Sequence, residues 1–70
     1  MATFAVVVRD MHGALEQIVF SQNVELWHVA TTAFAAGYLL IEGPHKKGND
    51  QIKGNEVIPW HQIVAIQQQA

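Results

Sequence analysis

Histidines are the side chains best suited to hold a metal or move protons in this sequence of 70 residues, which contains no cysteine. The four are His12, His28, His45 and His61, each sixteen or seventeen residues from the next. Ligands of a small metal site usually come in close pairs on one element, and a chain without cysteine cannot form thiolate sites. We therefore predict no metal site and no cofactor.

The sequence also lacks the usual patterns of catalysis. Gly43 and Gly48 have the spacing of a phosphate-binding loop, but Asn49 and Asp50 stand where such a loop needs its lysine and its hydroxyl residue. No serine, threonine or tyrosine lies beside a histidine, so no nucleophile is paired with a base. We predict that the protein is not an enzyme.

Positive charge is concentrated in one segment. Lys46, Lys47 and Lys53 fall within eight positions and are accompanied there only by Asp50, whereas the whole chain has a net charge of −2. Two interpretations remain open for this segment: an ordinary solvated loop, or a patch that contacts the phosphates of a nucleic acid.

Residues 57–66, VIPWHQIVAI, are two short apolar runs separated by a polar and aromatic corner. In this corner Trp60 offers a ring on which a base can stack, and His61 and Gln62 offer hydrogen-bonding groups. The alternative for Trp60, and for Tyr38, is burial in the core or in a subunit contact. For His61 the alternative is a structural role.

The elements that must position these residues are mostly strands. Ala14–Phe20 fits both a helical face and an alternating strand; we favour a strand and keep a short N-terminal helix as the alternative. The other predicted strands are Phe4–Val8, Val24–Ala30, Tyr38–Ile41, Glu56–Trp60 and Ile63–Ile66.

The chain has the organisation of one domain, residues 1–70. Turn-forming and polar residues predict a long loop over residues 43–55, with a short strand around Gln51–Lys53. Residues 67–70 are expected to fray. The longest uncharged stretch, residues 26–41, is shorter than the roughly 20 apolar residues of a membrane-spanning helix. Without a targeting segment, a cytoplasmic protein that does not enter membranes is expected.

Composition predicts self-association. Half of the residues are apolar and only 14% are charged, against roughly 25% in typical soluble domains. A chain this short is marginally stable alone, and several predicted strands are apolar on both faces. Together with Ala14–Phe20, the five other short strands predict an all-β fold, a small barrel or sandwich whose remaining apolar surface is covered by other subunits.

The corner at residues 57–66 resembles the second motif of the Sm/LSm family, and especially its bacterial Hfq-like branch. The segment Val24–Phe34 followed by Tyr38–Ile41 resembles the hairpin that precedes this motif in the family, and the resemblance covers roughly residues 15–67. The chain also resembles Sm-like proteins of phages. For a phage protein, the expected cytoplasmic location is the cytoplasm of the host cell. The chain departs from the family pattern at Ala35 and Ala36, where Asp and Asn are typical.

The resemblance implies a small five-stranded SH3-like or Sm-like β-barrel. It also implies that the barrels form a homo-oligomeric ring, which binds single-stranded RNA or DNA and takes part in RNA or DNA processing. Its subunits would pair through strands near residues 56–60 and 63–66. The alternative is an SH3-like structural or assembly module without a nucleic-acid ligand. The resemblance implies that the nucleic-acid-binding residues are Phe34, Tyr38, Trp60, His61 and Gln62. Lys46 and Lys47 of the polar loop complete the predicted binding site.

Overall fold

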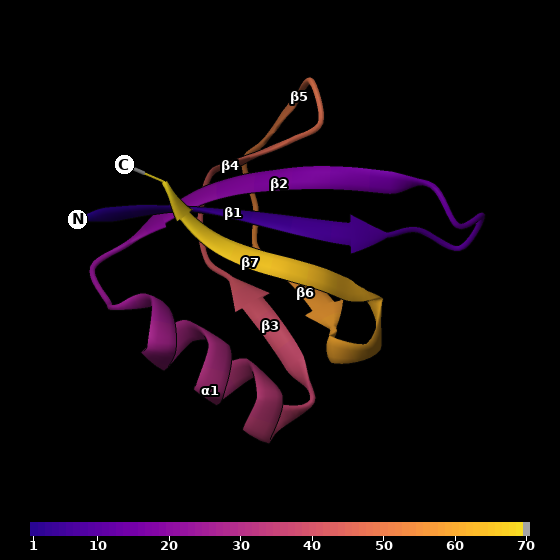
Figure 1. The fold of residues 1–70 in the computed structure, drawn as a ribbon. Coiled ribbons are helices and arrows are strands. Elements are labelled where there is room, and N and C mark those ends of the chain that lie inside the picture. The colour runs from indigo at the N-terminus through magenta and orange to yellow at the C-terminus, as the bar shows by residue number, and fades with distance from the viewer. Residues whose placement is uncertain (70) are drawn as a thin grey trace.

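The computed structural model describes residues 1–69 as a mostly β protein with one helix (Figure 1). The strands form a five-stranded antiparallel sheet and a separate two-stranded sheet. Among the described residues, no helix has the length and apolar character that a membrane crossing requires. In chain order the elements are β1 (Ala2–Arg9), β2 (Leu15–Gln22), α1 (Leu26–Ala36), β3 (Tyr38–Ile41), β4 (His45–Lys47), β5 (Asp50–Ile52), β6 (Glu56–Pro59), the 3₁₀ helix η1 (Trp60–Gln62) and β7 (Ile63–Gln69).

The large sheet is built on β1, which pairs with β2 on one edge and with β7 on the other. Its β-branched valines suit a pleated surface, and the predicted strand Phe4–Val8 is confirmed within it. The favoured strand over residues 14–20 is also confirmed, as β2, so the N-terminal helix kept as its alternative is wrong. In the connecting turn, the Asp10 carboxylate accepts hydrogen bonds from the backbone N–H groups of His12 and Ala14.

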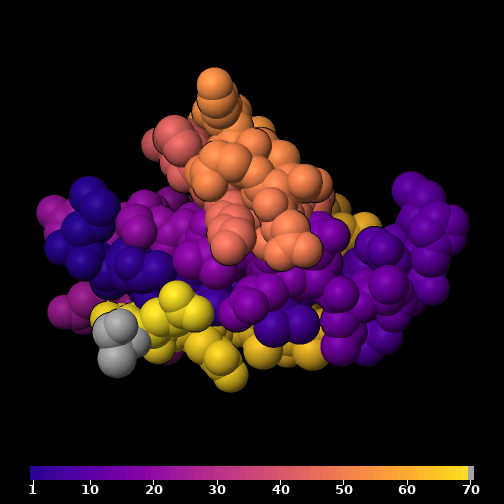
Figure 2. Space-filling view, turned by 90° about the horizontal axis from the view of Figure 1, so that it is seen from above, coloured from indigo at the N-terminus to yellow at the C-terminus, as the bar shows by residue number. Residues whose placement is uncertain are grey.

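Strands β3 to β6 form a single bent hairpin. The pairs His45↔Ile52 and Ile41↔Glu56 fall in the same register, although an unpaired kink separates β3–β6 from β4–β5. At the kink, Gly43 has a φ of 79° and its N–H donates to Asn55 Oδ1 at 2.8 Å. The predicted loop over 43–55 therefore contains two strands rather than one, and it projects from the body of the molecule (Figure 2).

The core lies between the large sheet, the β3–β6 sheet and α1 (Figure 1). The rings of Phe4 and Phe20 lie 5.5 Å apart between β1 and β2. Strict alternation places Leu39 and Ile41 of β3 inward while Tyr38 and Leu40 remain exposed. The buried hydrophobic residues are Phe4, Ala5, Val6, Val8, Ile18, Phe20, Val29, Ala33, Leu39, Ile41 and Ile58.

The prediction of a strand over Val24–Ala30, and of a hairpin strand over Val24–Phe34, is wrong, because α1 occupies most of this segment. Its second half is rich in alanine, the best helix former, and tertiary packing buries Val29 and Ala33 four residues apart on one face. Gly37 ends the helix with a φ of 84°, and its N–H donates to the Ala33 carbonyl at 2.9 Å.

The expected barrel is not closed. Because α1 separates β2 from β3, the edge of β2 that faces away from β1 pairs with β4, through Ile18↔Lys47 and Val19↔Lys46, and β3 lies in the other sheet. At the C-terminal end, where fraying is expected, Gln67–Gln69 pair with β1 through a backbone ladder that needs no apolar side chains. Ala70 lies outside the described residues.

Candidate functional site

An aromatic pair lies where α1 ends. Gly37 accepts a hydrogen bond from the Trp60 N–H at 2.9 Å, which ties the 3₁₀ corner to the end of the helix. This contact brings Phe34 of α1 to Trp60, with ring centroids 5.6 Å apart and planes at 75°. Phe34 is 67% exposed, whereas Trp60 packs partly against the core. One ring of the pair is therefore accessible to a ligand.

One other predicted binding residue lies beside this pair and two face elsewhere. Tyr38 pairs with Pro59 in the β3–β6 sheet, and Pro59 directly precedes Trp60 in the sequence. The Tyr38 side chain is 45% exposed. His61 is exposed on η1. Gln62 instead lines a separate small cavity of about 240 Å³. The structure thus brings Phe34 to Trp60 and places His61 beside Trp60 on η1, whereas Tyr38 lies on the outer face of the β3–β6 sheet.

The predicted lysines do not join the aromatic corner. Alternation along β4 leaves Lys46 exposed and turns Lys47 to the side of His45. The Lys47 ammonium lies 2.7 Å from Glu56 Oε2 and 4.0 Å from Glu16 Oε1, and it lines the same small cavity as Gln62. Its charge is therefore compensated within the chain rather than offered to a phosphate.

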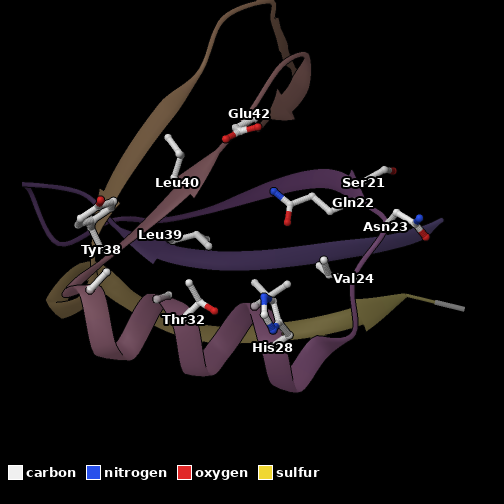
Figure 3. A pocket seen from close by; sticks show the side chains of 13 residues that line it. Ser21, Gln22, Asn23, Val24, His28, Thr32, Tyr38, Leu39, Leu40 and Glu42 are labelled. Carbon is white, nitrogen blue, oxygen red and sulfur yellow. The ribbon is translucent and has the colours of Figure 1, made fainter.

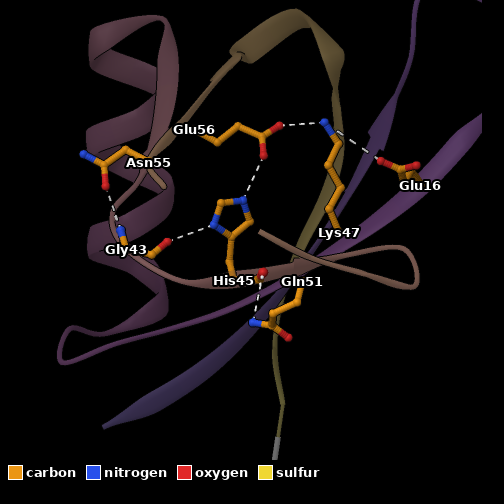
Figure 4. A network of polar contacts seen from close by, with 7 residues as sticks. All are labelled: Glu16, Gly43, His45, Lys47, Gln51, Asn55 and Glu56. Atoms are coloured by element: carbon orange, nitrogen blue, oxygen red, sulfur yellow. Dashed lines mark hydrogen bonds and ion pairs between the residues drawn. The ribbon is translucent and has the colours of Figure 1, made fainter. Parts of the chain in front are cut away.

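A polar network crosses the kink of the bent hairpin (Figure 4). The imidazole of His45 is fully buried, with Nδ1 at 3.0 Å from the Gly43 carbonyl and Nε2 at 2.8 Å from Glu56 Oε1. A carbonyl and a carboxylate both accept hydrogen bonds, so both ring nitrogens donate only when the ring carries two protons. These contacts fix the ring between the Gly43 carbonyl and the Glu56 carboxylate.

The same contacts shift two pKa values. Partial burial raises the pKa of Glu56, but hydrogen bonds from Lys47 and His45 outweigh it and hold this pKa below its ordinary value. The hydrogen bond to Glu56 raises the pKa of Lys47 above its ordinary value, against the opposing effect of burial. Both shifts favour the charged forms of Glu56 and Lys47, so the network joins β4 to β6 through a carboxylate that lies between the His45 ring and the Lys47 ammonium.

A groove of about 620 Å³ lies between α1, β3 and the end of β2 (Figure 3). Its apolar surface includes Val24, Val29 and Leu39. Polar groups border it, among them His28 on α1 and Glu42 just after β3. The size falls within the range of pockets that hold small ligands or short peptides, roughly 300–1,000 Å³.

Three strand edges near these features are unpaired within the described chain. β3 and β6 pair only with each other, and β7 pairs only with β1. The hydrogen bond from Trp60 N–H to Gly37 fixes the ladder, so Leu39 and Ile58 exchange bonds between β3 and β6. The intervening pair, Leu40↔Val57, therefore directs its main-chain groups to the two outer edges.

The His45–Glu56–Lys47 network and the groove are features that were not predicted from the sequence. The signal for part of the network is the two-residue spacing of His45 and Lys47, which puts both on one side of a strand. The groove left no comparable signal, since it depends on where α1 lies. Within residues 1–69, no group of three or more histidine, aspartate and glutamate side chains is placed to hold a metal ion.

Comparisons with other proteins assign no relative to this chain. Neither a family model, nor a curated protein, nor a solved structure matches it.

Proposed function

We propose that this protein is a self-assembling module in which β6 of one subunit pairs with β7 of the next. The observation that carries the proposal is that β6 and β7, the two strands joined by η1, each have one edge without a partner strand among the described residues. Unpaired edges are templates for a strand of another chain. The two edges belong to different sheets of one subunit, and a second copy brings a β7 edge to each β6 edge.

The side chains beside these edges support an interface. Val57 on β6 is 58% exposed and Val64 on β7 is 51% exposed. Burying such side chains contributes about 25 cal/mol per Å² of apolar surface. A head-to-tail contact of this kind forms a ring where the rotation between subunits closes.

The Sm-like relationship forms part of this proposal. It is supported by the order β6–η1–β7, in which a 3₁₀ turn joins two short strands, and by the position of β1 between β2 and β7. The inserted α1 and the open sheet distinguish this chain from the barrel that the resemblance implied.

Val57→Pro tests the assembly. The Val57 N–H points away from β3, so proline removes an intermolecular donor and leaves the bonds between β3 and β6 in place. We expect light scattering after gel filtration to show an oligomer for the wild type and mostly monomer for the variant. Leu40→Pro is the matched control, because Leu40 is paired with Val57 and its N–H points to the opposite edge. A monomeric wild type, or a variant of unchanged mass, would contradict the proposal.

A second candidate function is the binding of single-stranded nucleic acid by the assembled subunits. The observation that favours it is the exposed Phe34 ring in contact with Trp60, with the exposed His61 next to Trp60 on η1. Aromatic rings stack on bases with little sequence preference, at about 1–3 kcal/mol per base. Because Glu56 compensates Lys47, this binding would depend on stacking more than on phosphate contacts.

Phe34→Ala tests this second function. We expect it to weaken binding of a labelled single strand by about tenfold, since one stacking ring is lost. Trp27→Ala is the matched control, because Trp27 is similarly exposed, at 63%, near the other end of α1. Fluorescence anisotropy with poly-U, poly-A and single-stranded DNA at two salt concentrations measures the effect. If no strand binds to the assembled wild type, the protein is an assembly module alone.

A further inference from the structure

The outer edge of β3 offers a short row of free main-chain groups. Leu39 and Ile41 are the positions of β3 that bond to β6, so the N–H and C=O groups of Tyr38 and Leu40 point to the opposite edge. No backbone hydrogen bond within residues 1–69 pairs this edge with another strand. The row has the donor and acceptor pattern that one extended segment satisfies.

The groove lies along this edge (Figure 3). A segment added beside β3 has side chains that alternate between two faces. One set points inward over Val24, Val29 and Ala33, where the surface is apolar, and the other set points outward beside Tyr38 and Leu40. The groove therefore favours apolar side chains at every second position.

Charge at one end of the groove restricts the occupant further. Glu42 is exposed, follows β3 directly and takes part in no ion pair among the described residues. The other titratable groups on the lining are His28 and Tyr38. The groove thus has an uncompensated carboxylate at the end of the β3 edge, which favours a cationic side chain there.

We infer that the groove between α1 and β3 binds an extended peptide, which adds as a strand to the edge of β3. Its side chains are apolar at alternate positions, and a lysine or arginine lies beside Glu42. This site differs from the β6 and β7 edges of the proposed assembly, because it uses the opposite edge of the β3–β6 sheet. A subunit in the assembly keeps it free.

Selection from a random hexapeptide display library on the purified protein tests the inference. We expect the enriched peptides to alternate apolar residues and to carry lysine or arginine at one end. The most enriched peptide, synthesised with a fluorescent label, should bind Leu40→Pro about tenfold more weakly than the wild type, because the variant loses an outward donor and crowds the edge. Val57→Pro should bind it as the wild type does.

A second variant keeps the test valid if Leu40→Pro does not fold. Glu42→Lys changes an exposed side chain and should reverse the selection, so that acidic residues replace the basic ones. Backbone amide shifts of the wild type should move at Leu40 and along α1. Absence of enriched peptides, shifts confined to β6 and β7, or binding unchanged in both variants would overturn the inference. So would a loss of oligomer mass in Leu40→Pro, which would assign the edge to a second copy.

Discussion

Phe4→Ala is expected to lower the free energy of unfolding by about 3–5 kcal/mol. Phe4 has no solvent exposure, and its ring packs 5.5 Å from that of Phe20 at the centre of the large sheet. A domain of this length is stabilised by about 3–10 kcal/mol in total. The variant should therefore be partly or largely unfolded at 25 °C, as measured by circular dichroism during urea denaturation.

Phe34→Ala supplies the matched control, since it makes the same change at an exposed ring. Its only aromatic contact among the described residues is with Trp60, and such a contact contributes about 1 kcal/mol. Both variants should be compared at the same protein concentration, because assembly stabilises the folded chain. Equal losses of stability in the two variants would show that Phe4 is not part of the core.

The second large effect is expected for Glu56→Gln, which removes the charge at the centre of the polar network. At neutral pH we expect a loss of about 2 kcal/mol, because hydrogen bonds to charged groups contribute about 1.5–3 kcal/mol and a buried donor is left without its carboxylate. Most of the loss arises at His45, whose ring is fully buried, while Lys47 is partly exposed and regains water. Chemical denaturation at pH 7 measures this difference.

The network also sets how stability depends on pH. The folded-state pKa of Glu56 is lower than its unfolded value, so its contribution is present above the ordinary glutamate pKa and is lost as pH falls through the lower folded value. The folded-state pKa of Lys47 is higher, so its contribution is present below the ordinary lysine pKa and is lost as pH rises through the folded value. In Glu56→Gln, the free energy of unfolding should therefore vary less with pH in both the acidic and the alkaline range.

Glu42→Gln is the control for charge alone. Glu42 is exposed and makes no ion pair among the described residues, so its replacement should change stability by less than about 0.5 kcal/mol. If Glu56→Gln shows the same small loss and the wild-type pH profile, the network contributes nothing to stability in solution.

Local sequence signals were sufficient for most strands. The valines of Phe4–Val8 and the short apolar run Tyr38–Ile41 favour extended backbone wherever they lie, and both are strands in the structure. Pro59 correctly marked a bend, which is the 3₁₀ turn between β6 and β7. These features depend on residues within a few positions of one another.

The segment after Val24 shows where local signals were insufficient. Its alternation of Val24, Leu26 and His28 matched a strand, whereas its alanines matched a helix. The helix is favoured because it buries Val29 and Ala33 against the core and ends at a glycine in the left-handed region. The helix also explains why the predicted barrel does not close, because β3 and β2 lie in different sheets.

By itself the sequence determined the residue types available at the site and the mostly β character of the chain. It predicted Phe34, Tyr38, Trp60 and His61 as binding residues, and the structure brings Phe34 to Trp60 with His61 beside it on η1. It also grouped the lysines with them, but Lys47 lies against Glu56 instead. Tertiary structure decided this pairing, the groove and the unpaired edges, because each depends on where segments distant in sequence come together, and local propensity carries no information about that.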